Sequence, residues 1–294
     1  MHFSIDNQYQ ELILISKIQE ISQRHLLEII AVKAGIKDVM RIHITNHDEY
    51  KALENYCFNN NLNIDHSTFK LKVDWVNDIG DTFLFVVPWD DQSTDQFVAY
   101  ISKDPKILKR AVSIEVDENH SSSGRLYGYP ECCCRSYNDI SNGKKWIDLI
   151  LENSEGLFFE PWANKFSYLV HEFTLFPDYF PCNLSCTGTK SLSMEYYKLG
   201  LKNNLKEFVN MQLEMMTGLY FVGDHSVLSF KYFEYNKDYI IVNKSGSFTY
   251  GEKVQFFETM KLNIIIKGNN RYVQIKDELY RVLIFESHEE IGNT

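Results

Sequence analysis

The sequence predicts an α+β protein with a mixed α/β N-terminal layer, a helical core that bears most of the cysteines, and a C-terminal antiparallel β region. Stretches with helical periodicity alternate with short strand-like runs in the first part of the chain. Five of the six cysteines fall in two short segments of the middle part. Short strands separated by turn residues follow one another in the last part. We expect boundaries near residues 117 and 218, so that the three parts are 1–117, 118–218 and 219–294.

The N-terminal part alternates helices with strands. Apolar residues at helical spacing predict a long helix from about residue 8 to Ala34, and Gly35 then ends it. A second helix is expected at Asp48–Asn59, and a short third one at Asp104–Ala111, with Pro105 in its first turn. The strands expected in this part are Val39–Ile44, Phe69–Trp75, Thr82–Val87 and Gln96–Ser102.

The middle part is expected to be helical. It begins with the polar run 117–124, which predicts a loop. Apolar spacing then predicts helices at Glu131–Ile140, at Lys144–Glu152, at Lys165–Phe173, and from about Cys182 to Thr217, where Gly218 would stop the last one.

The last part is rich in short strand patterns with hairpin turns between them, which favours an antiparallel sheet or a small barrel. The expected strands are Phe230–Tyr235, Tyr239–Val242, Ser247–Tyr250, Lys253–Phe257, Lys261–Lys267, Arg271–Ile275 and Tyr280–Glu286.

Two short segments carry five of the cysteines. Residues 128–134 have the sequence Gly-Tyr-Pro-Glu-Cys-Cys-Cys, and residues 181–186 have the sequence Pro-Cys-Asn-Leu-Ser-Cys. Each segment has a proline where we expect a helix to start, a position that suits a residue without an amide hydrogen. The free amides and the dipole of a helix start favour a thiolate over a thiol. Two such helix starts facing each other would bring four sulfurs together.

We expect Cys132, Cys133, Cys182 and Cys186 to share one centre. Cys182 and Cys186 lie four residues apart and would share a face if their segment is helical. Four thiolates suit zinc, iron or an iron–sulfur cluster, which all prefer sulfur ligands. Adjacent cysteines on a helix diverge by about 100°. Cys132 and Cys133 therefore either bind together or divide the roles of ligand and free thiol, whereas Cys134 is expected to pack in the core.

Other residues near the two segments are candidates for a site role. His171 could complete a metal shell or act as the base for a cysteine nucleophile. Arg125 and Arg135 flank the first segment and are expected on the surface; the alternatives are that one of them holds an anionic substrate or lowers the pKa of a thiol. The aromatic segments 155–162 and 177–180 either line a substrate pocket or pack as buried loops.

The two cysteine motifs resemble those of a prokaryotic family of unknown function. Members of that family carry Gly-Tyr-Pro-x-Cys-Cys, followed by Pro-Cys-x-x-x-Cys upstream of a helix. The resemblance covers about residues 120–200, with both motifs in the same order. It implies that the four cysteines named above form the shared set, and that Cys134 stands where an apolar residue is expected. The family brings no settled activity, so the reaction stays open.

Three function hypotheses remain. The leading one is an enzyme whose four cysteines hold iron, an iron–sulfur cluster or zinc and act on a small organic or amino-acid-derived substrate, as in specialised metabolism. The first alternative is a metal-free enzyme that uses Cys132 or Cys133 as nucleophile with His171 as base, or that uses the thiols for redox chemistry. The second alternative is a binding module stapled by a structural zinc ion.

The composition of the chain argues against some classes of partner. A formal net charge of −10 argues against a general nucleic-acid binder, which needs a basic face. No apolar run approaches the roughly 20 residues that cross a bilayer, so no membrane partner is expected. The first residues lack the pattern of a secretory signal, and the cysteines are clustered rather than spread as a disulfide framework. We therefore expect a cytoplasmic protein with a small-molecule substrate.

Overall fold

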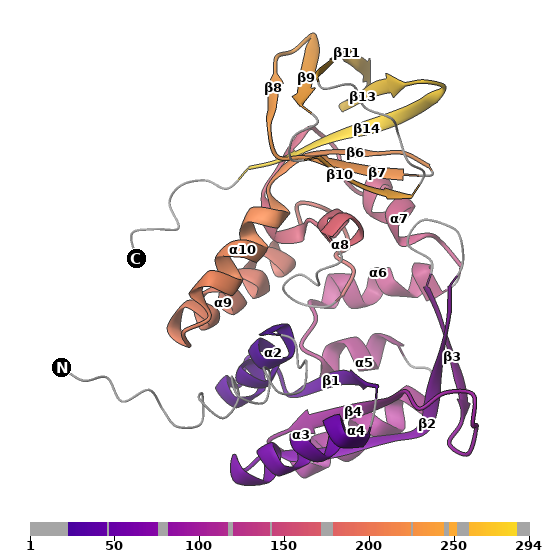
Figure 1. Cartoon of the computed structure of the whole chain (residues 1–294), viewed down its shortest axis with the longest axis vertical. Coiled ribbons are helices and arrows are strands. Elements are labelled where there is room, and N and C mark those ends of the chain that lie inside the picture. Colours follow the sequence, from indigo (N-terminus) through magenta and orange to yellow (C-terminus); the bar gives the residue numbers. More distant parts are fainter. Residues whose placement is uncertain are drawn as a thin grey trace, which may run out of the picture. The chain divides into compact units, whose positions relative to one another are not determined.

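The computed structural model describes the residues 23–45, 47–75, 82–116, 120–141, 143–171, 179–224, 226–243, 247–251 and 259–286 (Figure 1). They form helices and antiparallel sheets, which confirms the predicted α+β class. The described residues fall into two compact units. The first unit contains the described residues of the ranges 23–75, 82–141 and 195–208, and the second contains those of the ranges 143–194 and 209–286.

The first unit contains a four-stranded sheet in the order β1-β4-β2-β3, with antiparallel neighbours throughout. Its strands are β1 (Val39–Ile44), β2 (Asn63–Trp75), β3 (Thr82–Pro88) and β4 (Phe97–Ser102). The register of β2 against β4 shifts between His66 and Lys70. Ser67 lies at this irregularity, where its hydroxyl accepts the amide of Val98 at 3.2 Å and donates to the carbonyl of Phe69 at 2.6 Å. The side chain thus satisfies backbone groups that the shifted ladder cannot pair.

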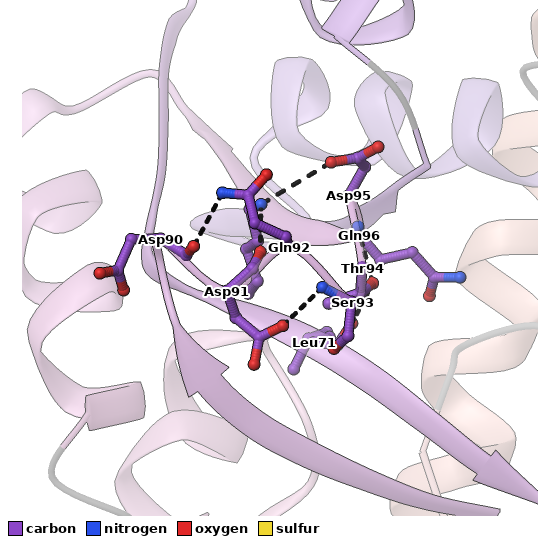
Figure 2. A network of polar contacts seen from close by, with 9 residues as sticks. Leu71, Asp90, Asp91, Gln92, Ser93, Thr94, Asp95 and Gln96 are labelled. Atoms are coloured by element: carbon purple, nitrogen blue, oxygen red, sulfur yellow. Dashed lines mark hydrogen bonds and ion pairs between the residues drawn. The ribbon is translucent and has the colours of Figure 1, made fainter.

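A short polar loop connects β3 to β4 (Figure 2). The carboxylate of Asp91 accepts the amide of Ser93 at 2.6 Å, and the hydroxyl of Thr94 donates to the carbonyl of Leu71 at 2.8 Å. The ammonium group of Lys70 donates to the carbonyl of Asp91 at 2.8 Å. These contacts attach the loop to β2 and fix where β4 begins.

The helices of the first unit include α2 (Gln23–Ala34), α3 (His47–Asn59), α4 (Pro105–Val116), α5 (His120–Leu126) and α6 (Glu131–Ser141). Apolar residues of α4 and α5 pack against one face of the sheet. This core consists of Val39, Phe69, Leu71, Val98 and Tyr100 from the strands and of Leu108, Ala111, Leu126 and Tyr127 from the helical segments. Burying this surface is the main force that holds the helices on the sheet.

The second unit contains two sheets. One has the order β10-β7-β6-β14-β13-β12, and the short strand β5 (Phe158–Phe159) pairs in parallel with β14. The other has the order β11-β9-β8. Residues of both sheets share one apolar core, which includes Phe221, Ile240 and Val282. The strands are β6 (Gly218–Val222), β7 (Ser226–Phe230), β8 (Phe233–Tyr235), β9 (Tyr239–Asn243), β10 (Ser247–Gly251), β11 (Thr259–Asn263), β12 (Ile265–Lys267), β13 (Asn270–Ile275) and β14 (Glu278–Phe285).

The remaining helical segments surround the second cysteine segment in the sequence. They are α7 (Trp146–Glu152), the 3₁₀ turn Pro161–Ala163, α8 (Phe166–His171), α9 (Thr187–Lys202) and α10 (Lys206–Met216). Within the part of the chain that the structure describes, no helix combines the length and apolar composition that crossing a bilayer requires.

Most expected elements of the described residues are present, with two corrections among the helices. Residues 120–124 belong to α5 rather than to a loop. The single helix expected from Cys182 to Thr217 is instead a turn followed by α9 and α10. Asn204 separates these two helices with a φ of 59°, and the amide of Leu205 donates to the carbonyl of Gly200 at 2.9 Å. This is a helix C-terminus with an asparagine in the left-handed conformation.

Other differences concern strands and element ends. The strands β6 and β7 were not expected, and the expected strands Phe230–Tyr235 and Lys261–Lys267 are each divided between two strands. β2 begins at Asn63, six residues before the expected start, and α4 extends to Val116. Gly218 opens β6 instead of merely ending a helix; its φ is 119°, and a Cβ there would lie 3.0 Å from the carbonyl oxygen of Phe230. The part of the long expected helix that precedes residue 23 and the strand expected at Lys253–Phe257 lie outside the described residues.

The first unit buries an ion pair. The ammonium group of Lys37 donates to the carboxylate of Glu28 on α2, and both residues are only 6% exposed. The hydroxyl of Tyr196, on the buried side of α9, donates to the same carboxylate oxygen at 3.2 Å. A buried carboxylate depends on such partners because it has lost its hydration.

We expect Lys37→Met to lower the free energy of unfolding by about 3–5 kcal/mol, because it leaves the Glu28 charge buried without a cation. Urea denaturation followed by circular dichroism measures this loss. The control is Lys231→Met, which breaks an exposed ion pair with Glu214 and should change the midpoint little. Equal effects of the two variants would contradict the prediction.

Candidate metal centre

The first cysteine segment follows a tight connection between α5 and α6. The amide of Gly128 donates to the carbonyl of Arg125 at 3.0 Å, and the amide of Tyr129 donates to the carbonyl of Gly124 at 2.9 Å. These bonds satisfy carbonyls at the end of α5. Gly128 has a φ of 78°, and a Cβ on it would lie 3.2 Å from the Cβ of Lys37. Both the backbone conformation and the close neighbour favour glycine.

Pro130 comes directly before Glu131, the first residue of α6. The carbonyl of Pro130 accepts the amides of Cys133 and Cys134 at 2.9 and 3.0 Å. Proline costs nothing here because a helix start would leave its amide unpaired in any case. Cys132 and Cys133 therefore lie in the first turn of a helix, as predicted.

Cys134 packs between the two helices. A Cβ on Gly124 would lie 2.8 Å from the Sγ of Cys134, so the absence of a side chain on α5 makes room for this sulfur. The Sγ atom also lies 3.6 Å from the carbonyl oxygen of Tyr129. Burial raises the pKa of the Cys134 thiol. The contacts agree with the packing role that the sequence predicts.

The arginines beside the first segment lie at the surface. Arg125 donates two hydrogen bonds of 2.6 Å to the carboxylate of Glu131. Arg135 lies 3.9 Å from the same carboxylate. The Arg125 hydrogen bond holds the pKa of the Glu131 carboxyl below its usual range. The guanidinium of Arg125 is thus engaged by a neighbouring side chain at the start of α6.

The second cysteine segment is a turn, which corrects the expectation of a helix start at Cys182. The helix α9 begins only at Thr187. The side-chain oxygen of Asn183 accepts the amide of Ser185 at 2.9 Å, and its backbone carbonyl accepts the amide of Cys186 at 3.4 Å. An asparagine that bonds to the backbone two residues further on stabilises a turn and competes with helix formation.

Both sulfurs of the second segment receive N–H groups. The amide of Thr189, in the first turn of α9, donates to the Sγ of Cys186 at 3.4 Å. The side-chain amide of Asn183 donates to the Sγ of Cys182 at 3.6 Å. Hydrogen bonds of this kind stabilise negative charge on sulfur. The turn therefore provides an environment that suits thiolates.

The four predicted cysteines lie together. The sulfurs of Cys132, Cys133, Cys182 and Cys186 are all within 4.8 Å of one another, and those of Cys132 and Cys133 are 3.9 Å apart. The divergence of neighbouring positions on a helix does not separate these two sulfurs, because their side chains converge in the first turn. All six cysteines of the chain are free thiols in this structure. The four could bind a metal ion.

The structure leaves the proposed role of His171 untested. His171 is the last residue of α8, but its side chain lies outside the described part of the chain. The next residue, Glu172, lies wholly outside it. The role of His171 as a base or ligand stays a prediction.

The aromatic residues before the second segment pack together. Phe180 stacks on Trp146 with ring centroids 5.1 Å apart, and Trp146 lies 5.8 Å from Phe166. The ammonium group of Lys165 lies 5.3 Å from the centroid of the Phe180 ring, and Lys165 is only 5% exposed. Sequence reasoning did not single out this buried lysine, because lysines are mostly exposed and nothing in the local sequence marks this one as buried.

Comparison with known proteins adds no assignment: no protein-family model matches the chain, and neither the curated proteins nor the solved structures contain a significant match. The fold and the site define the molecule as an α+β protein with a cluster of four cysteines that could bind metal.

We expect Cys57 to resist alkylation in the folded protein. Its burial, with a smaller contribution from the Glu54 carboxylate, raises the pKa of its thiol to about 12. At pH 8 the thiol is therefore almost wholly protonated and unreactive. Mass spectrometry of chelator-treated protein after brief iodoacetamide treatment should show label on the partly exposed Cys132 and Cys182 first. Cys57 should react only after denaturation, and equal rates in the folded protein would refute this prediction.

Proposed function

We propose that the protein is a metal-binding protein in which Cys132, Cys133, Cys182 and Cys186 hold a single zinc ion as a structural centre. The observation that carries this proposal is the mutual proximity of the four sulfurs, all within 4.8 Å. A zinc–sulfur bond of about 2.3 Å places the sulfurs of a tetrahedral site about 3.8 Å apart. A small contraction of the cluster would bring it to that size.

The spacing of the sulfurs favours one ion over an iron–sulfur cluster. Clusters divide their thiolate ligands among several iron atoms, so these ligands stand farther apart than four that share one ion. A single iron ion would fit the same sulfurs and would make the centre a one-electron carrier. Zinc is preferred because four thiolates in a tetrahedron are the ligand set of closed structural zinc sites.

A closed ligand set also distinguishes between the metalloenzyme hypothesis and the structural one. Catalytic zinc usually has three protein ligands and keeps a fourth position for water or substrate. Here four sulfurs are close enough to fill the tetrahedron. The arrangement therefore supports the structural alternative.

A metal-free thiol protein is the second candidate. The sulfurs of Cys132 and Cys133 are 3.9 Å apart, and the other two are nearby. Thiols at such distances can exchange and oxidise when a thiolate forms. The metal content of the purified protein separates this candidate from the first.

Elemental analysis of protein purified under reducing conditions without chelators tests the proposal. We expect about one zinc ion per chain, since four thiolates complete one tetrahedral site. Cys182→Ser should lose the metal, and its thermal midpoint should fall because metal binding is coupled to folding. The control is Cys134→Ser, one residue beyond the cluster, which should keep the metal.

Other results would point elsewhere. If the protein contains one iron ion and shows a visible absorption band, the centre is an electron carrier and the structural zinc proposal is wrong. If the wild type contains no metal and one clustered cysteine is alkylated fast, the metal-centre proposal is wrong and the metal-free thiol hypothesis takes its place. Loss of metal from Cys134→Ser alone would show that the cluster has been assigned to the wrong residues.

A further inference from the structure

The turn that holds Cys182 and Cys186 is tied to a serine far from it in the sequence. The backbone amide of Leu184, in the middle of the turn, donates to the hydroxyl of Ser154 at 2.9 Å. Both Leu184 and Ser154 are buried, with 2% and 4% of their surface exposed. The Ser154 hydroxyl in turn donates to the carbonyl of Ile150 on α7 at 2.6 Å. The hydroxyl therefore connects the turn to the end of a helix.

The segment that carries Ser154 is held by a buried arginine. Arg281 lies on β14, is only 5% exposed, and donates hydrogen bonds to the carbonyls of Ser154 and Leu151. It also donates to the side-chain oxygen of Asn270 at 2.8 Å. That same oxygen accepts the amide of Gly156 at 3.3 Å. Contacts on both sides of Ser154 thus fix this stretch of backbone against the sheet.

We propose that Ser154 and Arg281 are positioning residues of the metal centre, which set the conformation of the turn so that Cys182 and Cys186 point to one ion. This inference rests on the proposed metal centre. Neither residue is a ligand; Ser154 acts through the backbone of the turn, and Arg281 acts through Ser154. The chain of contacts runs from Arg281 to the carbonyl of Ser154, and from the Ser154 hydroxyl to the amide of Leu184.

The physical reason lies in the position of the Leu184 amide. It is buried between the two cysteines, and a buried amide without a partner loses stability. When Ser154 lacks its hydroxyl, the turn must move to find another acceptor or water. Any such movement turns Cys182 and Cys186 away from the tetrahedral arrangement. Residues that orient metal ligands typically change affinity by about 10- to 100-fold when they are mutated.

The test compares Ser154→Ala with Ser167→Ala, using the full-length chain. Ser167 is also buried in the second unit, and its hydroxyl donates to the carbonyl of Asn164 at 3.2 Å. Its substitution removes a comparable hydrogen bond without touching the cysteine turn. Zinc dissociation constants are measured by competition with a chromophoric chelator. Cobalt substitution then reports the ligand geometry through its visible absorption bands.

We expect Ser154→Ala to raise the zinc dissociation constant about 10- to 100-fold and to alter the cobalt spectrum. Ser154→Thr keeps the hydroxyl and should restore both in part. Arg281→Lys keeps the charge but loses the planar fork that reaches several acceptors, so it should weaken zinc binding as well. Ser167→Ala should bind zinc with wild-type affinity and give the wild-type cobalt spectrum.

Hydrogen exchange on chelator-treated protein separates the two proposals. Faster exchange of the Leu184 amide in Ser154→Ala, together with weaker zinc binding, supports the positioning role. If wild type and Ser154→Ala bind zinc equally, the positioning role is overturned while the metal centre stands. If Leu184 exchanges faster but the wild-type protein binds neither zinc nor cobalt, the metal centre falls and the positioning role falls with it.

Discussion

Four thiols within 4.8 Å of one another impose an electrostatic constraint on this protein. Negative charges on sulfurs this close to one another would repel. A cation among the sulfurs would offset that repulsion. The divalent ion that we propose would do this, and its binding would add to the stability of the folded state. The arrangement of the surrounding backbone is easiest to understand as support for such a centre.

The two cysteine segments reach the centre by different local structures. The first depends on Gly128 in the left-handed conformation, which ends α5, and on Pro130, whose carbonyl starts α6. The second depends on a turn that Asn183 closes through its side chain. A helix start and a closed turn share one property: both direct several backbone or side-chain N–H groups toward a small region. Such groups suit sulfur atoms that carry negative charge.

The contacts of Arg125, Trp146 and Phe180 are consistent with the structural role that we propose. The Arg125 guanidinium, which could have held an anionic substrate, is bound to Glu131. The aromatic residues Trp146 and Phe180 stack on each other. These side chains pack against or form ion pairs with neighbouring residues. The four sulfurs themselves are enough to complete a tetrahedral shell.

Local signals in the sequence determined the α+β class, most strands, the helix at Glu131 and the identity of the four clustered cysteines. Periodicity and turn chemistry act over a few residues, so they can be recognised without knowing the fold. Tertiary contacts decided the rest. α5 forms despite its serine run, with Gly124 leaving room for the sulfur of Cys134. The turn at Cys182, which Asn183 closes locally, is also bonded through Leu184 to Ser154, 30 residues away. Arg281 binds the carbonyl of Ser154 across 127 residues of chain. Hydrogen bonds between such distant residues leave no periodic trace in the sequence, which is why only the folded structure could reveal them.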